Sequence, residues 1–216
     1  MTTRDGMNQP RIDIGRVEGD INAIARFGFN EEDRGVYRQG FSPEDMAARQ
    51  WLRGRMGELG LDHRMDGAGN VIGRYDPDGA GADKPAIVIA SHLDSVPAGG
   101  IFDGVLGVVA GLEVIRTMKD AGVKPNYPIE VIATSEEEGR FGGMLGAQAM
   151  TGNLTREWLE GAADEHGLAL KDAMADAGLD YLQALHAYRR PETLHDFLEL
   201  HVEQGPVLDT ENTTIG

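Results

Sequence analysis

The chain has 216 residues, a formal net charge of −16 and no cysteine. Its length suits about one to two domains, and its acidic character argues against nucleic-acid and membrane-surface partners, because like charges repel. The absence of cysteine excludes disulfides and thiolate ligands, so a bound metal would need histidine or carboxylate ligands.

The first third of the chain is predicted to contain two helices and a hairpin. Residues 1–10 are polar, and neither they nor the longest apolar run, 105–112, resemble a secretory signal or a membrane span. We therefore predict a cytoplasmic protein. Apolar residues spaced by three and four predict a helix over about 11–26, and a second helix begins at the cap Ser42 and ends at Gly60. A turn at 69–70 joins two short strands.

A strand–helix–strand unit follows. The runs 86–90 and 129–133 are apolar on both faces, as in the strands of parallel sheets that helices cover on both sides. A helix over 105–122 connects them. Residues 143–187 have a helical pattern interrupted by glycines, and 197–202 are predicted as a last strand. The predicted fold class is α/β, a three-layer sandwich around a mainly parallel or mixed sheet.

Polar clusters lie where the predicted strands end, and ligands of open α/β sheets collect at those ends. The clusters are SHLD at 91–94, GGIFDG at 99–104, EEEG at 136–139 and HVEQGP at 201–206. Three successive glutamates after a buried strand would repel one another unless a cation compensated, which favours a metal. One carboxylate could bind that metal while its neighbour accepts a proton from a bound water.

These clusters also allow a purely structural interpretation. Asp103 stands where a helix N-cap would, although the glycines around it would let its carboxylate approach a cation. His92 and Asp94 would point the same way in an extended chain, so the carboxylate could orient a metal-binding imidazole; a lone histidine there is more often only packed. No other common catalytic motif competes. The remaining histidines are interpreted as structural or solvent-exposed: His63, His166, His186 and His195.

Taken together, SHLDSVPAGGIFDGVLG, SEEEGRFGGMLGAQAMTG and LELHVEQGPVLD resemble the zinc amidohydrolases that cleave N-carbamoyl-L-amino acids, allantoate or β-ureidopropionate. These enzymes are a branch of the dinuclear aminoacylase and carboxypeptidase family. The motifs occur in the family's order, and the resemblance extends over nearly the whole chain from the first helix on. It implies a small ureido or amide substrate and two divalent metal ions, with zinc expected and Mn, Co or Ni as alternatives.

The resemblance also implies roles for individual residues. His92 and His201 would bind one metal, Glu138 would bind the other, and Asp103 would bridge both. Glu137 corresponds to the general base, which takes a proton from the water that attacks the carbamoyl or amide carbon.

Further implications concern the surroundings of the metals and the extent of the domain. Asp94 corresponds to the carboxylate behind His92, and Gln204 lies in a segment that borders the substrate pocket. The resemblance implies longer family members and a full-length form that is a homodimer. From the length we expect residues 1–216 to be the N-terminal part of the catalytic domain. The lid and dimerisation domain, the C-terminal return segment and a distal histidine ligand would then be absent, leaving little activity and an exposed edge strand.

Two alternatives stay open. One is a metallopeptidase or aminoacylase of the wider family, and the other is a non-catalytic metal-binding fragment.

Overall fold

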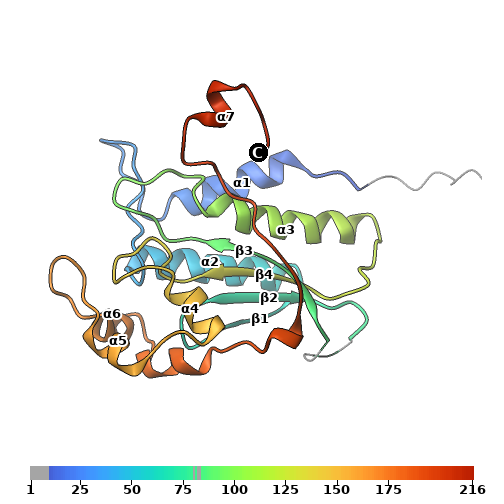
Figure 1. The fold of residues 1–216 in the computed structure, drawn as a ribbon. Helices are drawn as coiled ribbons and strands as arrows, with labels where there is room; N and C mark the ends of the chain where they lie inside the picture. The colour runs from blue at the N-terminus through green and yellow to red at the C-terminus, as the bar shows by residue number, and fades with distance from the viewer. Residues whose placement is uncertain (1–9, 80, 82–83) are drawn as a thin grey trace, which may run out of the picture.

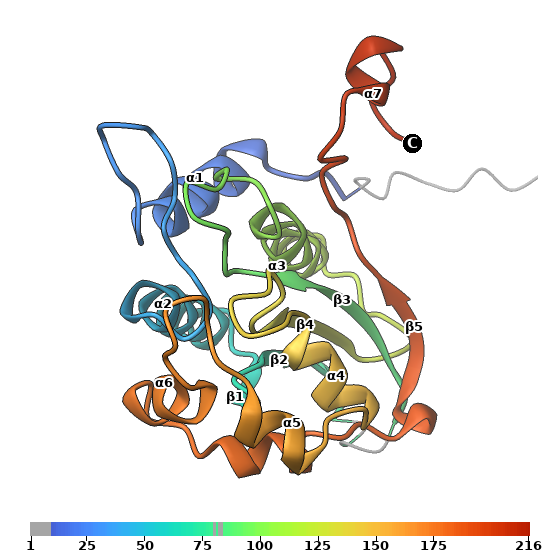
Figure 2. The same ribbon diagram turned by 60° about the vertical axis from the view of Figure 1, so that its left-hand side comes forward.

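The computed structural model describes residues 10–79, 81 and 84–216, so most of the segment used to judge a secretory signal lies outside the described residues. Its centre is a five-stranded sheet in the order β1-β2-β4-β3-β5 (Figures 1 and 2). The strands are β1 (Asp62–Met65), β2 (Val71–Tyr75), β3 (Ala86–His92), β4 (Ile129–Thr134) and β5 (Leu194–Leu198). β2 pairs antiparallel with β1 and β4, whereas β3 pairs parallel with β4 and β5. The predicted α/β sandwich around a mixed sheet is confirmed.

Three helices cover one face of the sheet: α1 (Ile14–Ala25), α2 (Pro43–Glu58) and α3 (Val105–Asp120). They share one hydrophobic core with the strand residues that point toward them, such as Val71 and Val131. Burying such side chains stabilises the fold by roughly 1.5–3 kcal/mol each, and this packing fixes β3 and β4 beneath α3.

The opposite face is covered in part by α4 (Leu145–Thr151), whose Met150 packs against Ile72 and Ile132. A second cluster lies beyond it, formed by α5 (Arg156–Gly161), α6 (Leu170–Asp176) and the 3-10 helix η1 (Tyr181–His186). Two short helices complete the elements, η2 (Pro191–Thr193) and α7 (Val207–Thr210). Four short helices, α4, α5, α6 and η1, lie within residues 143–187, where the sequence predicts a helical pattern interrupted by glycines.

Local signals account for the helix ends that the sequence predicts. The Ser42 side chain accepts a hydrogen bond from the Asp45 N–H, which caps α2 as expected. The helix ends two residues before Gly60, whose φ of 68° is the left-handed conformation that glycine adopts without strain.

The last strand differs from its prediction. β5 spans Leu194–Leu198 rather than 197–202, and its register is set by β3, with Ala86 opposite Leu194 and Ile89 opposite Leu198. Among the described residues β5 pairs with no other strand, and all five of its residues are exposed. The structure therefore has the exposed edge strand that was expected, at the right of Figure 2. Within the described part of the chain, no helix combines the length and apolarity that crossing a bilayer requires.

Candidate metal centre

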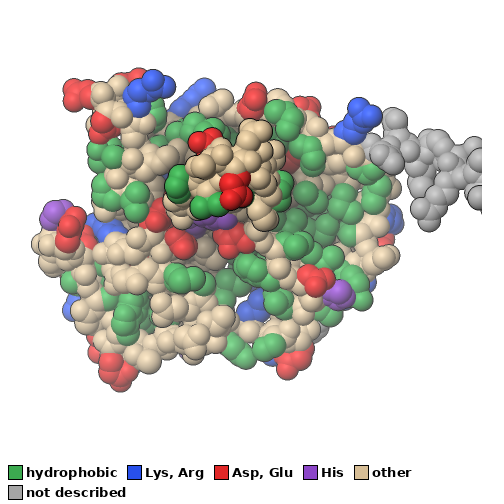
Figure 3. Space-filling view, turned by 45° about the horizontal axis from the view of Figure 1, so that its top comes forward, with side chains coloured by type: hydrophobic (Ala, Val, Ile, Leu, Met, Phe, Trp, Pro, Cys, Tyr) green, Lys and Arg blue, Asp and Glu red, His purple; other side chains and the backbone are tan. Residues whose placement is uncertain are grey.

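Histidine and carboxylate side chains gather at the edge of the sheet where β3 and β4 end. His92 is the last residue of β3, Glu137 and Glu138 follow β4, and His201 lies beyond β5. Asp103 approaches from the loop before α3. Figure 3 shows histidine surrounded by acidic side chains on this part of the surface. The parallel pairing of β3 with β4 and β5 brings these distant positions to one edge.

The His92 imidazole is held on both sides. It is 1% exposed, and its Nδ1 lies 3.0 Å from the carbonyl oxygen of Asp94. The ring packs against Gly104, where an added Cβ would lie 2.5 Å from Cγ and Nδ1 of His92. A proton on Nδ1 would leave Nε2 with a free lone pair directed at the acidic side chains.

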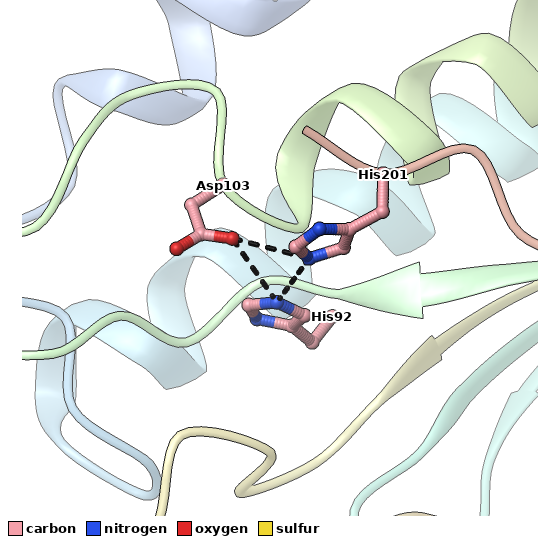
Figure 4. Close-up of side chains that lie close together, drawn as sticks. All are labelled: His92, Asp103 and His201. Carbon is pink, nitrogen blue, oxygen red and sulfur yellow. Dashed lines mark hydrogen bonds and ion pairs between the residues drawn. The ribbon is translucent and has the colours of Figure 1, made fainter. Parts of the chain in front are cut away.

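The first group of possible ligands is His92, Asp103 and His201, whose side chains point toward one another in Figure 4. Asp103 Oδ1 lies 3.2 Å from His201 Nε2 and 3.6 Å from His92 Nε2, and the two Nε2 atoms are 3.4 Å apart. The other Asp103 oxygen accepts a hydrogen bond of 2.7 Å from Gln204 Nε2. Gln204 therefore contacts a ligand candidate directly.

The second group is His92, Glu137 and Glu138. Glu137 Oε2 lies 3.7 Å from His92 Nε2. Burial raises the pKa of Glu138 above its ordinary value, although the neighbouring His92 lowers it. His92 is thus common to both groups. Asp103 belongs only to the first group, so its bridging role stays a prediction.

The contacts of Asp94 differ from the expected contact between its carboxylate and His92, and its role at the site stays a prediction. The imidazole of His92 contacts the backbone carbonyl of Asp94, whereas the Asp94 carboxylate accepts a hydrogen bond of 3.0 Å from the Glu138 N–H. β3 ends at His92, so Asp94 lies beyond the paired part of the strand. Burial, together with the nearby Asp45 carboxylate, raises the pKa of Asp94 to about 6.

The helix-cap interpretation of Asp103 is wrong. The N-cap of α3 is Gly104, no side chain caps that helix, and the Asp103 carbonyl accepts a 2.6 Å hydrogen bond from the Val105 N–H. This is a tight three-residue turn, which only a glycine at its centre adopts easily. The turn directs the Asp103 carboxylate toward the histidines.

A cation fits the donor set. Asp103 Oδ1 and Glu138 Oε1 are buried and accept no hydrogen bond among the described residues, although Asp103 Oδ1 lies 3.2 Å from His201 Nε2. A buried carboxylate oxygen without a partner is costly. Imidazole and carboxylate are the ligands that zinc and related divalent metals take in the absence of cysteine.

Two residues to which the sequence assigned no role at the site support the loop of residues 136–139 that follows β4, here called the glutamate loop. Glu136 does not face the site: its two oxygens accept N–H bonds from Phe141 and Gly143, and burial raises its pKa to about 7. Asn70 is fully buried, and its amide oxygen accepts the Ser135 N–H at 3.0 Å. The sequence signal that could have indicated Asn70 is its place in DGAGN, where a polar residue directly follows a glycine turn.

The other four histidines stand apart from both groups. His195 lies on β5 and contacts Asp196, while His166 lies beside Glu165. The clusters of possible metal ligands in the described residues contain none of the four: His63, His166, His186 and His195.

The chain is similar to several known proteins. An N-carbamoyl-L-amino acid amidohydrolase of Geobacillus stearothermophilus is 45% identical over 185 residues, which is 84% of this chain and 44% of that protein. A ureidoglycolate hydrolase of Oryza sativa subsp. japonica is 36% identical, over 95% of this chain and 43% of its own length. The crystal structure of a hydantoinase/carbamoylase family amidase from Burkholderia ambifaria matches with a TM-score of 0.85 and 36% identity, covering 96% of this chain and 49% of that one. The chain spans about half the length of the curated relatives it matches.

A family model covers the part of the chain that holds the candidate centre. The model describes the peptidase family M20/M25/M40 and matches residues 88–216, which include every member of both ligand groups. Because this match takes in more than half of the chain, the chain belongs to the peptidase family M20/M25/M40.

Proposed function

We propose that this chain carries a dinuclear metal centre for hydrolysis of a linear amide C–N bond in an N-carbamoyl amino acid, allantoate or a related ureido compound. The observation that carries the proposal is the convergence of two imidazoles and three carboxylates at one edge of the sheet. The relatives support the substrate class, since two of them are named for N-carbamoyl-L-amino acid and ureidoglycolate hydrolysis. A cytoplasmic location and the absence of nucleic-acid and membrane partners stay predictions.

In this proposal His92, His201, Asp103 and Glu138 hold the cations. Divalent cations bound there would polarise the scissile carbonyl and lower the pKa of water. Glu137 is the general base: its side chain is 35% exposed, so it remains accessible to a water and a substrate. Its carboxylate would take the proton from the attacking water and return it to the leaving nitrogen.

The two cations should be bound unequally. His92, Asp103 and His201 provide three ligands to one ion, as zinc generally requires in catalytic sites. If Glu137 is kept for proton transfer, Glu138 has fewer partners among the described residues. We therefore expect the ion of the histidine group to bind more tightly than the ion of Glu138.

A small molecule has room beside Glu138. A cavity of about 270 Å³ opens there, between the glutamate loop and the loop that follows β3. This volume is close to the lower end of the range for small-molecule sites. Its lining includes Ser95 and Pro97 from the loop after β3, and Glu138 and Arg140 from the side of the glutamate loop.

The experiment measures metal content and turnover on the same preparation. The 216-residue chain is loaded with Zn²⁺ or Co²⁺ and assayed with N-carbamoyl-L-amino acids, allantoate, N-acetyl amino acids and dipeptides. We expect two cations and slow turnover of the carbamoyl or ureido compounds, and Glu137→Gln should abolish turnover while both cations remain bound. His201→Ala should release the ion of the histidine group, whereas the control His195→Ala should keep both.

The outcomes separate the three candidate functions. A chain that binds no divalent cation would refute the proposed centre. Preferred turnover of N-acetyl amino acids or dipeptides would assign the chain to the peptidase or aminoacylase alternative. Two bound cations without turnover of any of these compounds would indicate a metal-binding chain that is not catalytic by itself.

A further inference from the structure

Arg49 of α2 is fully buried although it is charged. Its Nη1 donates to the carbonyls of Gly69 and Ala133 at 3.2 and 3.3 Å, and its Nη2 donates to the carbonyl of Thr134 at 3.1 Å. Ala133 and Thr134 are the last residues of β4, and only Ser135 separates them from the glutamate loop. The guanidinium therefore ties α2 to the point where the chain leaves the sheet for the candidate centre.

Arg49 also lies between two buried carboxylates. Its Nε is 2.9 Å from Asp45 Oδ1, and its Nη2 is 3.6 Å from Asp94 Oδ1. The side chains of all three residues are at most 1% exposed. Among the described residues Asp94 Oδ1 accepts no hydrogen bond, so the cation of Arg49 is its nearby electrostatic partner.

Asp94 in turn contacts two of the ligand candidates, Glu138 and His92. Its Oδ2 accepts the Glu138 N–H at 3.0 Å, and its carbonyl lies 3.0 Å from Nδ1 of His92. A shift of Asp94 would therefore move the backbone of Glu138 and release the ring of His92. A buried charged array of this kind is expensive to desolvate and is weak as a source of stability. Its position directly under the candidate ligands suggests a role in their geometry.

We propose that Arg49 is a positioning residue for the metal centre, because it fixes the Asp94 carboxylate and through it the placement of Glu138 and His92. This inference rests on the proposed function, since it presumes that Glu138 and His92 bind metal. Arg49 itself touches neither substrate nor metal in this proposal.

The test is a double-mutant cycle on Co²⁺ affinity and on the Co²⁺ ligand-field spectrum, with the 216-residue chain. Arg49→Met and Asp94→Asn should each weaken Co²⁺ binding in the His92–Glu138 group by about tenfold to a hundredfold and change the spectrum. The double variant should bind no more weakly than the weaker single variant, because both changes break one connection.

Arg74→Met is the matched control. Arg74 is also a buried arginine paired with a carboxylate, Glu130 at 2.8 Å, but it lies nearer the other end of the sheet. We expect this variant to lose stability in denaturant while keeping the wild-type Co²⁺ affinity and spectrum. An equal loss of affinity in Arg74→Met would mean that general destabilisation explains the result, and would overturn the inference.

Wild-type affinity and spectrum in folded Arg49→Met, or additive losses in the double variant, would also overturn it. If Arg49→Met does not fold, Arg49→Lys replaces it, because lysine keeps the charge but cannot span the same set of acceptors. If neither folds, Asp94→Asn decides, since unchanged Co²⁺ binding in that variant removes the proposed connection. A wild-type chain without Co²⁺ binding would instead refute the metal centre itself, so the two failures are distinguishable.

Discussion

Replacing Gly104 by alanine tests whether His92 owes its position to the backbone beneath it. Gly104 has φ 64° and ψ −46° at the centre of the turn that places Asp103. A Cβ built there would lie 2.5–2.6 Å from three atoms of the His92 ring. The ring has little freedom to move away, because His92 is 1% exposed and its Nδ1 is engaged by a carbonyl.

The expected loss has two parts. An alanine held at this backbone conformation costs about 1–3 kcal/mol in strain, and overpacking the ring adds about 1–3 kcal/mol. The free energy of unfolding of Gly104→Ala should therefore fall by about 2–6 kcal/mol. Displacement of His92 should also weaken Co²⁺ binding by at least about tenfold.

Gly122→Ala provides the control at the other end of α3. Gly122 has φ 65°, close to that of Gly104, but an added Cβ would have nothing within 4 Å. This variant should lose about 1 kcal/mol of stability and keep its affinity for Co²⁺. Urea unfolding of the metal-free chain and Co²⁺ titration measure the two effects separately.

The reasoning would be refuted if Gly104→Ala and Gly122→Ala lost the same stability and both bound Co²⁺ as the wild type does. That result would mean that His92 is free to shift without loss, or that its place is set by other contacts.

Three more predictions concern other parts of the fold. Gly146→Ala would place a Cβ 2.0 Å from the Asn70 amide oxygen. Urea unfolding should therefore show that the free energy of unfolding falls by at least about 1 kcal/mol. The control Gly161→Ala, whose Cβ would have nothing within 4 Å, should show no such fall. Burial raises the pKa of Asp66 above its ordinary 3.8, so its contribution to stability is greatest below that pH and is lost as the pH rises through the folded-state pKa. The unfolding free energy of the wild type minus that of Asp66→Asn, measured in urea from pH 4 to 7, should therefore fall with pH, and a flat difference would contradict this. Phe197 is 52% exposed on the edge strand, so Phe197→Lys should reduce self-association in light scattering with little change in stability.

The sequence predicts those elements whose signals are local. The apolar runs that became β3 and β4 identify buried strands by themselves, and the Ser42 cap sets the start of α2. Ligand candidates could be grouped because parallel strands end at one edge of a sheet. The convergence of His92 and His201, separated by more than a hundred residues, follows from that rule.

What the sequence could not predict depends on tertiary contacts. The bounds of β5 are set by its register with β3, and the apolar residues on both sides of Leu198 allow several alignments. Arg49 was missed because helical periodicity assigns charged residues to the solvent face, whereas its partners are carbonyls 20 and more residues away in the chain. The hydrogen bond from the Glu138 N–H to the Asp94 carboxylate likewise joins residues 44 positions apart in the chain.

The ligand candidates differ in how firmly the fold holds them: His92 and Glu138 are fixed more firmly than His201. His92 is 1% exposed and pairs with Thr134 of β4, and the Asp94 carboxylate accepts a hydrogen bond from the Glu138 N–H. His201 lies beyond an exposed edge strand, so ordering its segment costs about 1–2 kcal/mol per residue in backbone entropy. The hydrogen bond from Gln204 to Asp103 offsets part of that cost before an ion binds. A polypeptide segment that packed on β5 would order the His201 segment and so raise the affinity of the ion bound by His201. His92 and Glu138 would keep the positions they already have.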